Sequence, residues 1–240
     1  MRLKGDSWLL NIPIAHRGLW GGNLIENSIP AYKNAISHGF AIEIDVYSSV
    51  DGELFCFHDQ NLERMTGAKG KIYEKTAKEL KLLSLSDSKE KIPTFDEVLS
   101  TVNGKVPLLI ELKDQPNGVF VDKVVNRLKS YKGEFAIQSF NPLYIKRVKK
   151  LAPKFICGVL GTKTHSKHLP LIKRLIVKNL CLNLLIKPDF ISYSFEDLPL
   201  KKSKTKSLPI IAWTITSAKE YQKVKSFVKN IIFENFIPNK

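Results

Sequence analysis

The chain has 240 residues, of which 43% are hydrophobic and 25% are charged, and this composition excludes a largely disordered polypeptide. Its 38 Lys and Arg against 23 Asp and Glu give a net charge of +15. That excess favours anionic partners (phosphate compounds, acidic membrane surfaces or nucleic acid) without choosing among them. The longest apolar stretch, 169–186, contains too many charges to span a bilayer, and the three cysteines have no CxxC spacing. We therefore expect a soluble protein of a reducing cytoplasm.

Short apolar runs and helix-like segments alternate through the first half of the chain. The pattern predicts a strand at 12–15, a helix at 28–37, a strand at 41–46 and a returning strand at 54–57. A polar insertion from about 59 to 91 follows, with a short helix at 77–82. Thr94 with Glu97 three positions later is an N-cap signal for a helix at 94–102.

The alternation becomes regular in the second half. It predicts strands at 106–112, 135–139, 155–160, 190–193, 209–214 and 231–233, and helices at 119–130, 143–151, 170–179 and 218–228. Counted without the returning strand, the chain has eight strands, and eight strand–helix units imply a parallel sheet closed into a barrel. The expected fold is therefore α/β, a TIM-type (β/α)8 barrel with a short insertion after the second strand, forming a single domain over 1–240.

Three acidic residues fall at informative places on the predicted strands. Glu43 and Asp45 are two apart on one strand, so both carboxylates point to the same face, and Glu111 ends a later strand. Neighbouring buried carboxylates repel one another unless they are protonated or neutralised by a cation. Oxygen ligands converging at a barrel mouth suit Mg²⁺, Ca²⁺ or Mn²⁺. The alternative is that Glu43 or Asp45 merely pairs with Lys113 or Arg17.

Two histidines end apolar runs beside charged neighbours. His16 precedes Arg17 after the first strand, and His58 precedes Asp59 after the returning strand. Cleavage of a phosphodiester needs a base and an acid, and histidine titrates near neutral pH. Arg17, Lys113 and a metal ion would supply positive charge to the non-bridging oxygens. We expect the remaining histidines at the surface: His38, His165 and His168.

Short motifs follow one another in a specific order. The first half contains HRG at 16–18, ENS at 26–28, EIDV at 43–46, FHD at 57–59, LER at 62–64 and ELK at 111–113. Three further motifs are weaker: IPT at 92–94, QSF at 138–140 and IAWT at 211–214. In order and spacing, over nearly its full length, the chain resembles the glycerophosphodiester phosphodiesterase family.

The resemblance implies the site. It assigns an acid–base pair, metal ligands and substrate-binding residues: His16 and His58; Glu43, Asp45 and Glu111; Arg17, Glu26, Asn27, Lys113 and Trp213. The metal would be one divalent cation, Mg²⁺ or Ca²⁺, with Mn²⁺ as a further option. Arg17 and Lys113 would bind phosphate, while Glu26 and Asn27 would hydrogen-bond in the pocket or add to the ion's coordination. Trp213 would form an apolar wall against the glycerol chain, or alternatively be an ordinary core tryptophan.

The resemblance also implies the reaction. Family members are hydrolases of lipid and glycerol metabolism that convert glycerophosphodiesters to glycerol 3-phosphate and an alcohol. The glycerol 2-hydroxyl would attack phosphorus within the same substrate molecule. The protein would then need only to position the substrate and neutralise the charge of its phosphate. A related barrel phosphodiesterase acting on lysophospholipids is the alternative. The basic surface and the amphipathic segment 171–186 keep peripheral contact with an anionic membrane open. No nucleic-acid reader motif is present, and no protein partner is implied.

Three features depart from the family's usual pattern. Met65 stands where threonine is common, and the last strand ends in FEN at 233–235 in place of an ending that contains aspartate. The insertion at 59–91 is short, which predicts a more open mouth.

Overall fold

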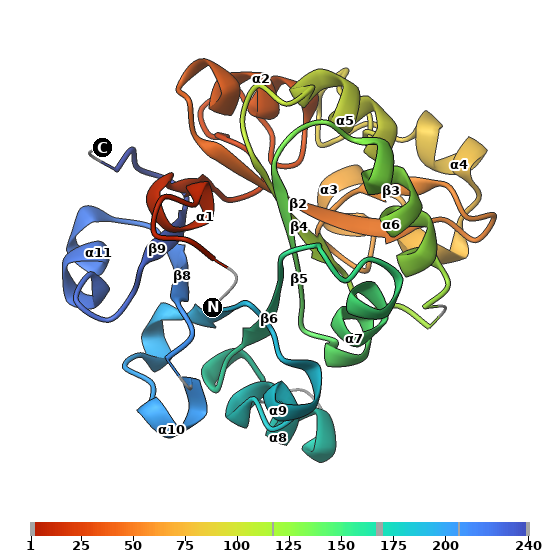
Figure 1. Cartoon of the computed structure of the whole chain (residues 1–240). Helices are drawn as coiled ribbons and strands as arrows, with labels where there is room; N and C mark the ends of the chain where they lie inside the picture. The colour runs from red at the N-terminus through yellow and green to blue at the C-terminus, as the bar shows by residue number, and fades with distance from the viewer. Residues whose placement is uncertain (1–2, 117, 167–169, 206, 239–240) are drawn as a thin grey trace. The chain divides into compact units, whose positions relative to one another are not determined.

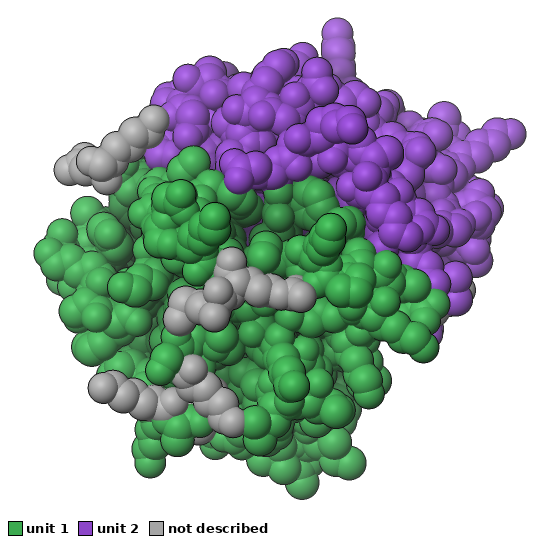
Figure 2. All heavy atoms as spheres, viewed as in Figure 1, with its two compact units in different colours: residues 1–14, 135–240 green, residues 15–134 purple. Residues whose placement is uncertain are grey.

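The structure is a computed structural model that describes residues 3–116, 118–166, 170–205 and 207–238. The chain divides into two compact units (Figure 2). Unit 1 comprises residues 1–14 and 135–240, and unit 2 comprises residues 15–134.

Unit 2 is built on three strands. The central strand β2 (Ala41–Ser48) pairs parallel with β4 (Leu108–Leu112) and antiparallel with β3 (Leu54–Cys56). All residues of these three strands are buried. The two-residue strand β1 (Ile14–Ala15) precedes His16. The register places Asp45 opposite Glu111, so two of the three acidic residues are neighbours across the β2–β4 pair.

The four helices predicted for unit 2 begin within one residue of the expected positions. Helix α2 (Ile29–Ser37) follows Ser28, whose side chain accepts a hydrogen bond from the backbone N–H of Ala31. Helix α5 (Phe95–Val102) begins with the predicted capping box of Thr94 and Glu97. The other helices of this unit in the described residues are α3 (Glu63–Thr66), the 3-10 turn η1 (Ile72–Glu74), α4 (Ala77–Leu82) and α6 (Phe120–Ser130).

The insertion between β3 and α5 has a hydrophobic core of its own. The sequence suggests a mixed, polar segment, yet α3, η1 and α4 bury apolar side chains against β2 and β3. Met65, at one of the departures from the family pattern, is buried in this cluster. The complete buried set is Tyr47, Phe55, Phe57, Leu62, Met65, Ile72, Leu80, Leu85 and Ile92. The short insertion is therefore a packed cap that holds α3 and the preceding loop in place.

Unit 1 contains five parallel strands that pair in chain order. They are β5 (Phe135–Ser139), β6 (Cys157–Gly161), β7 (Phe190–Ser194), β8 (Ile210–Ile215) and β9 (Asn230–Phe233). The helical segments described in this unit are α1 (Trp8–Asn11), α7 (Pro142–Leu151), η2 (Thr164–Ser166), α8 (Leu171–Asn179), α9 (Asn183–Ile186), η3 (Phe195–Asp197), α10 (Lys202–Thr205) and α11 (Ala218–Val224) (Figure 1).

The succession of parallel strands and helices confirms the predicted α/β fold class, a TIM-type (β/α)8 barrel. Several boundaries differ from the sequence prediction; β4 begins at Leu108 where 106 is predicted, and β6 begins at Cys157 where 155 is predicted. The first strand begins at Ile14 where 12 is predicted, because α1 ends at Asn11 and Ile12 caps it. The last helix ends at Val224 where 228 is predicted. Cys56 and Cys157 are buried in strands as expected, and Cys181 is exposed. The single-domain organisation stays a prediction.

Candidate active site

The loop that follows β1 has a constrained backbone. Arg17 and Asn27 both adopt left-handed conformations, with φ of 58° and 51°, which cost non-glycine residues about 1–3 kcal/mol. The N–H of Asn27 donates to the carbonyl of Arg17 over 2.9 Å and holds this geometry. Gly18 has φ of 84°, and a Cβ there would lie 3.0 Å from the backbone of Ala31. The HRG sequence therefore needs its glycine, because α2 packs directly against it.

Three carboxylates meet beneath this loop. One oxygen from each of Glu43, Asp45 and Glu111 lies within 4.8 Å of the others, and all three residues are buried. Glu43 and Asp45 come from one face of β2, and Glu111 comes from the paired strand β4. The backbone N–H of Arg17 donates to Glu43 Oε2 over 3.1 Å. The three predicted metal ligands are therefore brought together by adjacent parallel strands.

The electrostatics of this cluster indicate an excess of negative charge. Burial, reinforced by the neighbouring charges of Asp45 and Glu111, raises the pKa of Glu43 well above its usual value. Burial would also raise the pKa of Asp45, but the positive charges of Lys113, His58 and Arg17 hold it below its ordinary range. Asp45 Oδ1 is buried and receives no hydrogen bond from the described residues, and its charged neighbour is the Lys113 ammonium at 3.3 Å. An acceptor of this kind beside two further carboxylates fits a divalent cation.

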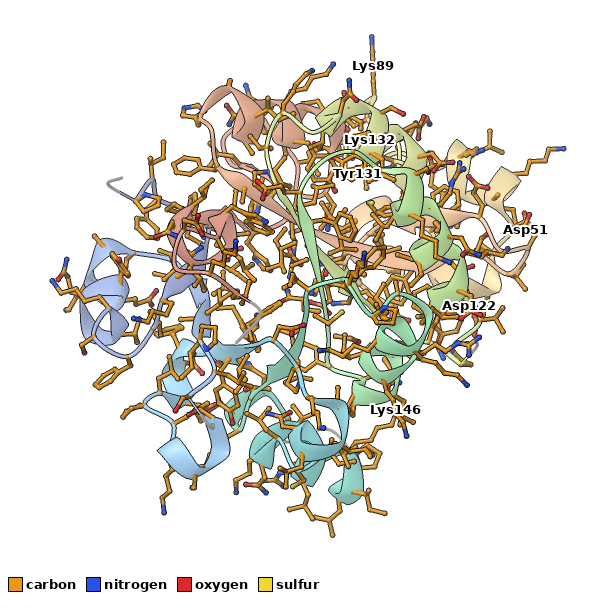
Figure 3. The ribbon with its side chains drawn as sticks, in the orientation of Figure 1. Asp51, Lys89, Asp122, Tyr131, Lys132 and Lys146 are labelled. Carbon is orange, nitrogen blue, oxygen red and sulfur yellow. The ribbon has the colours of Figure 1, made fainter. Side chains whose placement is uncertain are left out.

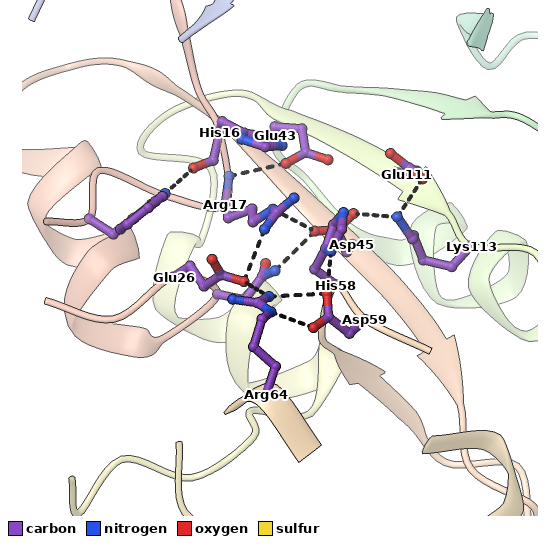
Figure 4. A network of polar contacts seen from close by, with 12 residues as sticks. His16, Arg17, Glu26, Glu43, Asp45, His58, Asp59, Arg64, Glu111 and Lys113 are labelled. Carbon is purple, nitrogen blue, oxygen red and sulfur yellow. Dashed lines mark hydrogen bonds and ion pairs between the residues drawn. The ribbon is translucent and has the colours of Figure 1, made fainter. Parts of the chain in front are cut away.

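Two basic side chains border the carboxylates. Lys113 Nζ lies 2.9 Å from Glu111 Oε1 and 3.3 Å from Asp45 Oδ1. Arg17 Nε lies 3.7 Å from Asp45 Oδ2. Burial alone would lower the pKa of Lys113, but Glu111 and Asp45 raise it, so the ammonium keeps its charge. The ion pairing considered from the sequence is thus present alongside the carboxylate cluster (Figure 4).

His58 is oriented by its neighbour in the sequence. Its Nδ1 lies 2.7 Å from Asp59 Oδ1, which leaves Nε2 as the ring nitrogen available to a ligand. Burial and the charge of Lys113 lower the pKa of His58, and the hydrogen bond to Asp59 opposes that shift. Hydrogen bonds from His58 and Arg64 outweigh burial and depress the pKa of Asp59. Asp59 thus remains a carboxylate that fixes the ring.

Arg64 joins two parts of the site and was not among the predicted site residues. Its Nε donates to Asp59 Oδ2 over 2.5 Å, and its Nη2 donates to Glu26 Oε1 over 2.5 Å. The same Glu26 oxygen accepts from Arg17 Nη1 over 3.0 Å. A continuous chain of charged hydrogen bonds therefore runs from His58 through Asp59, Arg64 and Glu26 to Arg17 (Figure 4). The LER motif at 62–64 contains Arg64, and it was the feature of the sequence that could have identified Arg64 as a site residue.

Asn27 is a supporting residue in this arrangement. Its Nδ2 donates to Asp45 Oδ2 over 3.0 Å, and its Oδ1 accepts from the hydroxyl of Tyr32 over 2.9 Å. Tyr32 is fully buried on α2 and was also not among the predicted site residues. Both ends of the Asn27 amide are therefore satisfied, and its nitrogen orients one oxygen of Asp45.

The sequence of this chain matches the family model described as the glycerophosphoryl diester phosphodiesterase family over residues 16–237. The chain belongs to that family. A glycerophosphodiester phosphodiesterase of Caldanaerobacter subterraneus is 35% identical over 162 residues, which are 61% of this chain and 65% of that protein. A putative one of Bacillus subtilis is 32% identical over 160 residues, 61% of this chain and 64% of that protein. The matched segment thus spans somewhat less than two thirds of these relatives.

Solved structures of the glycerophosphoryl diester phosphodiesterase family show the same fold. An Oleispira antarctica phosphodiesterase, in complex with the product sn-glycerol-3-phosphate, has a TM-score of 0.80 at 23% identity, covering 94% of this chain and 93% of that one. The Thermotoga maritima glycerophosphodiester phosphodiesterase has a TM-score of 0.72 at 23% identity, covering 92% and 93%. At this identity the likeness confirms the fold.

The hydrogen-bond chain just described does not include two of the predicted site residues of this family member. His16 lies beside Glu43 in Figure 4, and its carbonyl accepts from Trp20 Nε1 over 3.0 Å. Trp213 lies on β8 in unit 1, where its ring packs against Phe140 and His165. Of the histidines expected at the surface, His38 and His165 are exposed, and His168 lies outside the described residues.

A cavity of about 480 Å³ opens beside the catalytic candidates. Polar residues of the insertion form much of its wall, and His58 and Lys113 also line it. Its lining is Tyr47, His58, Asp59, Gln60, Asn61, Glu63, Arg64 and Lys113. The volume falls within the range of small-molecule sites, so the cavity has room for a ligand beside both groups.

Proposed function

We propose that this protein hydrolyses glycerophosphodiesters to glycerol 3-phosphate and an alcohol. The observation that carries the proposal is the convergence of Glu43, Asp45 and Glu111 with His58 and Lys113 in unit 2. The relatives from Caldanaerobacter subterraneus and Bacillus subtilis support the reaction class by their names, and the product bound to the Oleispira antarctica neighbour is the one expected here.

We assign a single divalent cation, Mg²⁺ or Ca²⁺ with Mn²⁺ as a further option, to Glu43, Asp45 and Glu111. The buried acceptor Asp45 Oδ1 and the raised pKa of Glu43 support this assignment, because a cation would relieve both. When bound, such an ion supplies Lewis acidity toward a phosphoryl oxygen. The remaining steps are assigned to side chains of the protein.

Arg17 and Lys113 would neutralise the non-bridging phosphate oxygens. Arg17 is held for this task by Glu26, and Lys113 keeps its charge beside Glu111. The same two groups stabilise the charge that increases in the transition state. Asn27 would fix the position of Asp45 and line the pocket.

His16 and His58 would be the acid–base pair. We assign His16 as the base that deprotonates the glycerol 2-hydroxyl and His58 as the acid that protonates the leaving alkoxide. Asp59 supports the second assignment, because it holds Nδ1 and keeps Nε2 directed away from itself. The attacking hydroxyl belongs to the substrate, so holding it near phosphorus makes the step effectively unimolecular. Its attack would form a cyclic phosphate as the bond from phosphorus to the alcohol oxygen breaks and His58 protonates the departing alkoxide. Water would then open this cyclic phosphate with the two histidines exchanging roles.

The alcohol part of the substrate would occupy the cavity lined by Gln60, Asn61 and Glu63. Its polar wall suits a small polar head group, and Trp213 would contact the glycerol chain as the resemblance implies. The partner is thus a small-molecule glycerophosphodiester, and we place the reaction in lipid and glycerol metabolism. A cytoplasmic location stays a prediction; no helix within the described segments is long and apolar enough to cross a membrane.

Hydrolysis of lysophospholipids is the second candidate. A rat protein described as lysophospholipase D is 29% identical over 134 residues, covering 50% of this chain and 42% of that protein. The polar, open cavity beside His58 has room for the head group of a lysolipid. Cleavage of lysophosphatidylcholine in vesicles without cleavage of glycerophosphocholine would favour this candidate.

The deciding experiment measures release of glycerol 3-phosphate from glycerophosphocholine and glycerophosphoethanolamine. Each assay is run with EDTA and then with Mg²⁺, Ca²⁺ or Mn²⁺. We expect release that is restored by a metal and lost in His16→Ala. Absence of release with every ion would contradict the proposed substrate class.

A further inference from the structure

Large apolar side chains gather on the outside of α8 and α9 in unit 1. Their exposed fractions are 70% for Leu171, 74% for Ile172, 46% for Leu175, 64% for Leu184 and 59% for Leu185. Elsewhere in the described segments, exposed large apolar side chains are spread over both units: Val50, Leu82, Val119, Leu143, Phe227 and Ile237. Single exposed leucines are normal in folded proteins, whereas a gathering of five marks an interaction surface.

The core-facing side of α8 is already packed. Val177 and Leu180 are buried, and with Ile176 they line a small pocket together with Phe140 and Val159. The outer residues 171, 172 and 175 occupy one stripe at helical spacing on the other side. The core of unit 1 therefore does not require them, so folding alone does not account for their apolar character.

Basic residues surround this stripe. Lys173 and Lys187 are exposed, Arg174 and Lys178 are half-buried, and the segment 170–188 contains no Asp or Glu. We name the five exposed apolar residues together with these four basic residues the α8–α9 face.

The neighbouring helix α7 extends the positive charge. Lys149 Nζ donates to the carbonyl of Lys187 over 2.6 Å, which joins α7 to the end of α9. Lys146, Arg147 and Lys150 are exposed on α7, and Figure 3 labels Lys146 on the outer side of this helix. The apolar stripe therefore lies within a broad basic surface.

We propose that the α8–α9 face docks on an anionic lipid surface. Exposed leucines flanked by Lys and Arg are the features of an interfacial helix, because the apolar side chains enter the acyl boundary while the cations meet the head groups. A second copy of the chain fits the face less well, since a symmetric contact would oppose two basic surfaces. Nucleic acid would use the cations but would leave the apolar stripe exposed.

Docking of this kind is separate from the proposed hydrolysis and does not depend on it. If both hold, the protein works beside the membrane from which lysophospholipids and glycerophosphodiesters arise. The test is therefore a binding measurement on the full chain, whose result is independent of catalysis.

Flotation with two kinds of vesicle tests the docking. One kind is phosphatidylcholine alone, and the other is equal parts phosphatidylcholine and phosphatidylglycerol. We expect the chain to float with the anionic vesicles and to bind phosphatidylcholine at least about tenfold more weakly. Equal binding to both kinds, or binding to neither, would overturn the proposal.

Paired variants separate lipid docking from general adsorption to polyanions. Leu171→Ser with Ile172→Ser should weaken binding to anionic vesicles at least about tenfold, and so should Lys173→Glu with Lys187→Glu. Leu184→Ser with Leu185→Ser gives a second apolar test if the first pair impairs folding.

The matched control is Leu82→Ser with Val119→Ser, which removes equally exposed apolar side chains from unit 2. Binding by the control should equal that of the unchanged chain, and release from glycerophosphocholine should be unchanged in the Leu171 pair. Loss of binding in the lysine pair with full binding in both leucine pairs would indicate simple electrostatic adsorption and overturn the proposal. A dimer in sedimentation that dissociates in the Leu171 pair would instead assign the face to a second copy.

Discussion

The two units of this chain differ sharply in charge. Unit 1 contains 22 Lys and Arg against 6 Asp and Glu, whereas unit 2 contains 16 against 17. The whole excess of +15 therefore comes from unit 1. Unit 2, with a balanced composition, contains the buried cluster of Glu43, Asp45 and Glu111. The net charge of the chain thus comes from unit 1, whereas we place the chemistry in unit 2.

This separation has a physical reason. A site that binds both a cation and a phosphate needs charges of both signs at short range, which a balanced region provides through specific pairs such as Lys113 with Glu111. A diffuse excess of one sign acts over a longer range and attracts anionic surfaces. If the chemistry belongs to unit 2 alone, substitutions in that unit should change the rate most.

Glu43→Gln should lower the metal-dependent rate on the order of 10³-fold, because the ion loses a ligand and the cluster loses a charge. The measurement is release of glycerol 3-phosphate at saturating Mg²⁺, with Mg²⁺ binding followed by calorimetry. Glu196→Gln in unit 1 is the matched control, since Glu196 is an exposed carboxylate that pairs with His165. A variant at Glu43 with a full rate would remove the basis for the metal site.

Asp59→Asn should lower kcat about 10²-fold, because His58 loses the carboxylate that fixes its ring. The hydrogen bond to Asp59 raises the pKa of His58, so its loss lowers that pKa. A general acid must be protonated, and the alkaline limb of the pH–rate profile should therefore move to lower pH. A substrate with an activated leaving group should recover most of the loss. Failure of that substrate to do so would contradict the assignment of His58 as the acid.

Arg64→Ala should reduce kcat about tenfold, because Arg64 holds both Asp59 and Glu26 in position. Arg64→Lys should recover little of the loss, since a lysine ammonium cannot reproduce the forked contacts of a guanidinium. Arg127→Ala removes an exposed arginine that pairs with Asp96 in the same unit and should leave the rate unchanged. If Arg64 only stabilised the fold, the loss of kcat in Arg64→Ala would be accompanied by a matching loss of thermal stability. Arg64→Lys would then restore kcat in full.

Trp213→Leu tests whether unit 1 contributes to substrate binding. The resemblance implies an apolar wall, so KM for glycerophosphocholine should rise roughly fivefold while kcat stays the same. Phe233→Leu, a buried aromatic of β9, controls for loss of packing in the same unit. An unchanged KM in Trp213→Leu would assign Trp213 to the core and confine substrate binding to other residues.

Asp197→Asn should leave the rate unchanged and lower the free energy of unfolding by about 1–2 kcal/mol. Asp197 accepts hydrogen bonds from the N–H groups of Lys163 and Thr164 and from two threonine hydroxyls, and these bonds outweigh burial and lower its pKa. Because the pKa of Asp197 is lower in the folded chain than in the unfolded chain, where it is about 3.9, its carboxylate stabilises the fold at a pH above that value. This contribution is lost as the pH falls through the pKa of the folded state. Urea unfolding at neutral and acidic pH should show the difference from the unchanged chain shrinking in acid. A constant difference would exclude the charge of Asp197 as its source.

The sequence by itself determined the order of the eight barrel strands and singled out the three carboxylates that we propose as metal ligands. Apolar residues predicted β2 and β4 as buried strands. A buried strand tolerates a charged side chain only where that charge is needed. Glu43, Asp45 and Glu111 are the charged residues of these two strands, and they were therefore singled out. Capping residues such as Thr94 act within one turn of helix, so α5 began where a local pattern placed it.

Tertiary structure alone decided the partners of those residues. Arg64 is separated from Glu26 by 38 positions, and no local pattern fixes which carboxylate a long guanidinium side chain will reach. The same is true of the α8–α9 face, because the sequence shows an amphipathic segment but cannot tell which apolar residues the core will bury. Packing of Val177 and Leu180 inward left Leu171 and Ile172 exposed, since one helix can bury only one of its faces against a single layer.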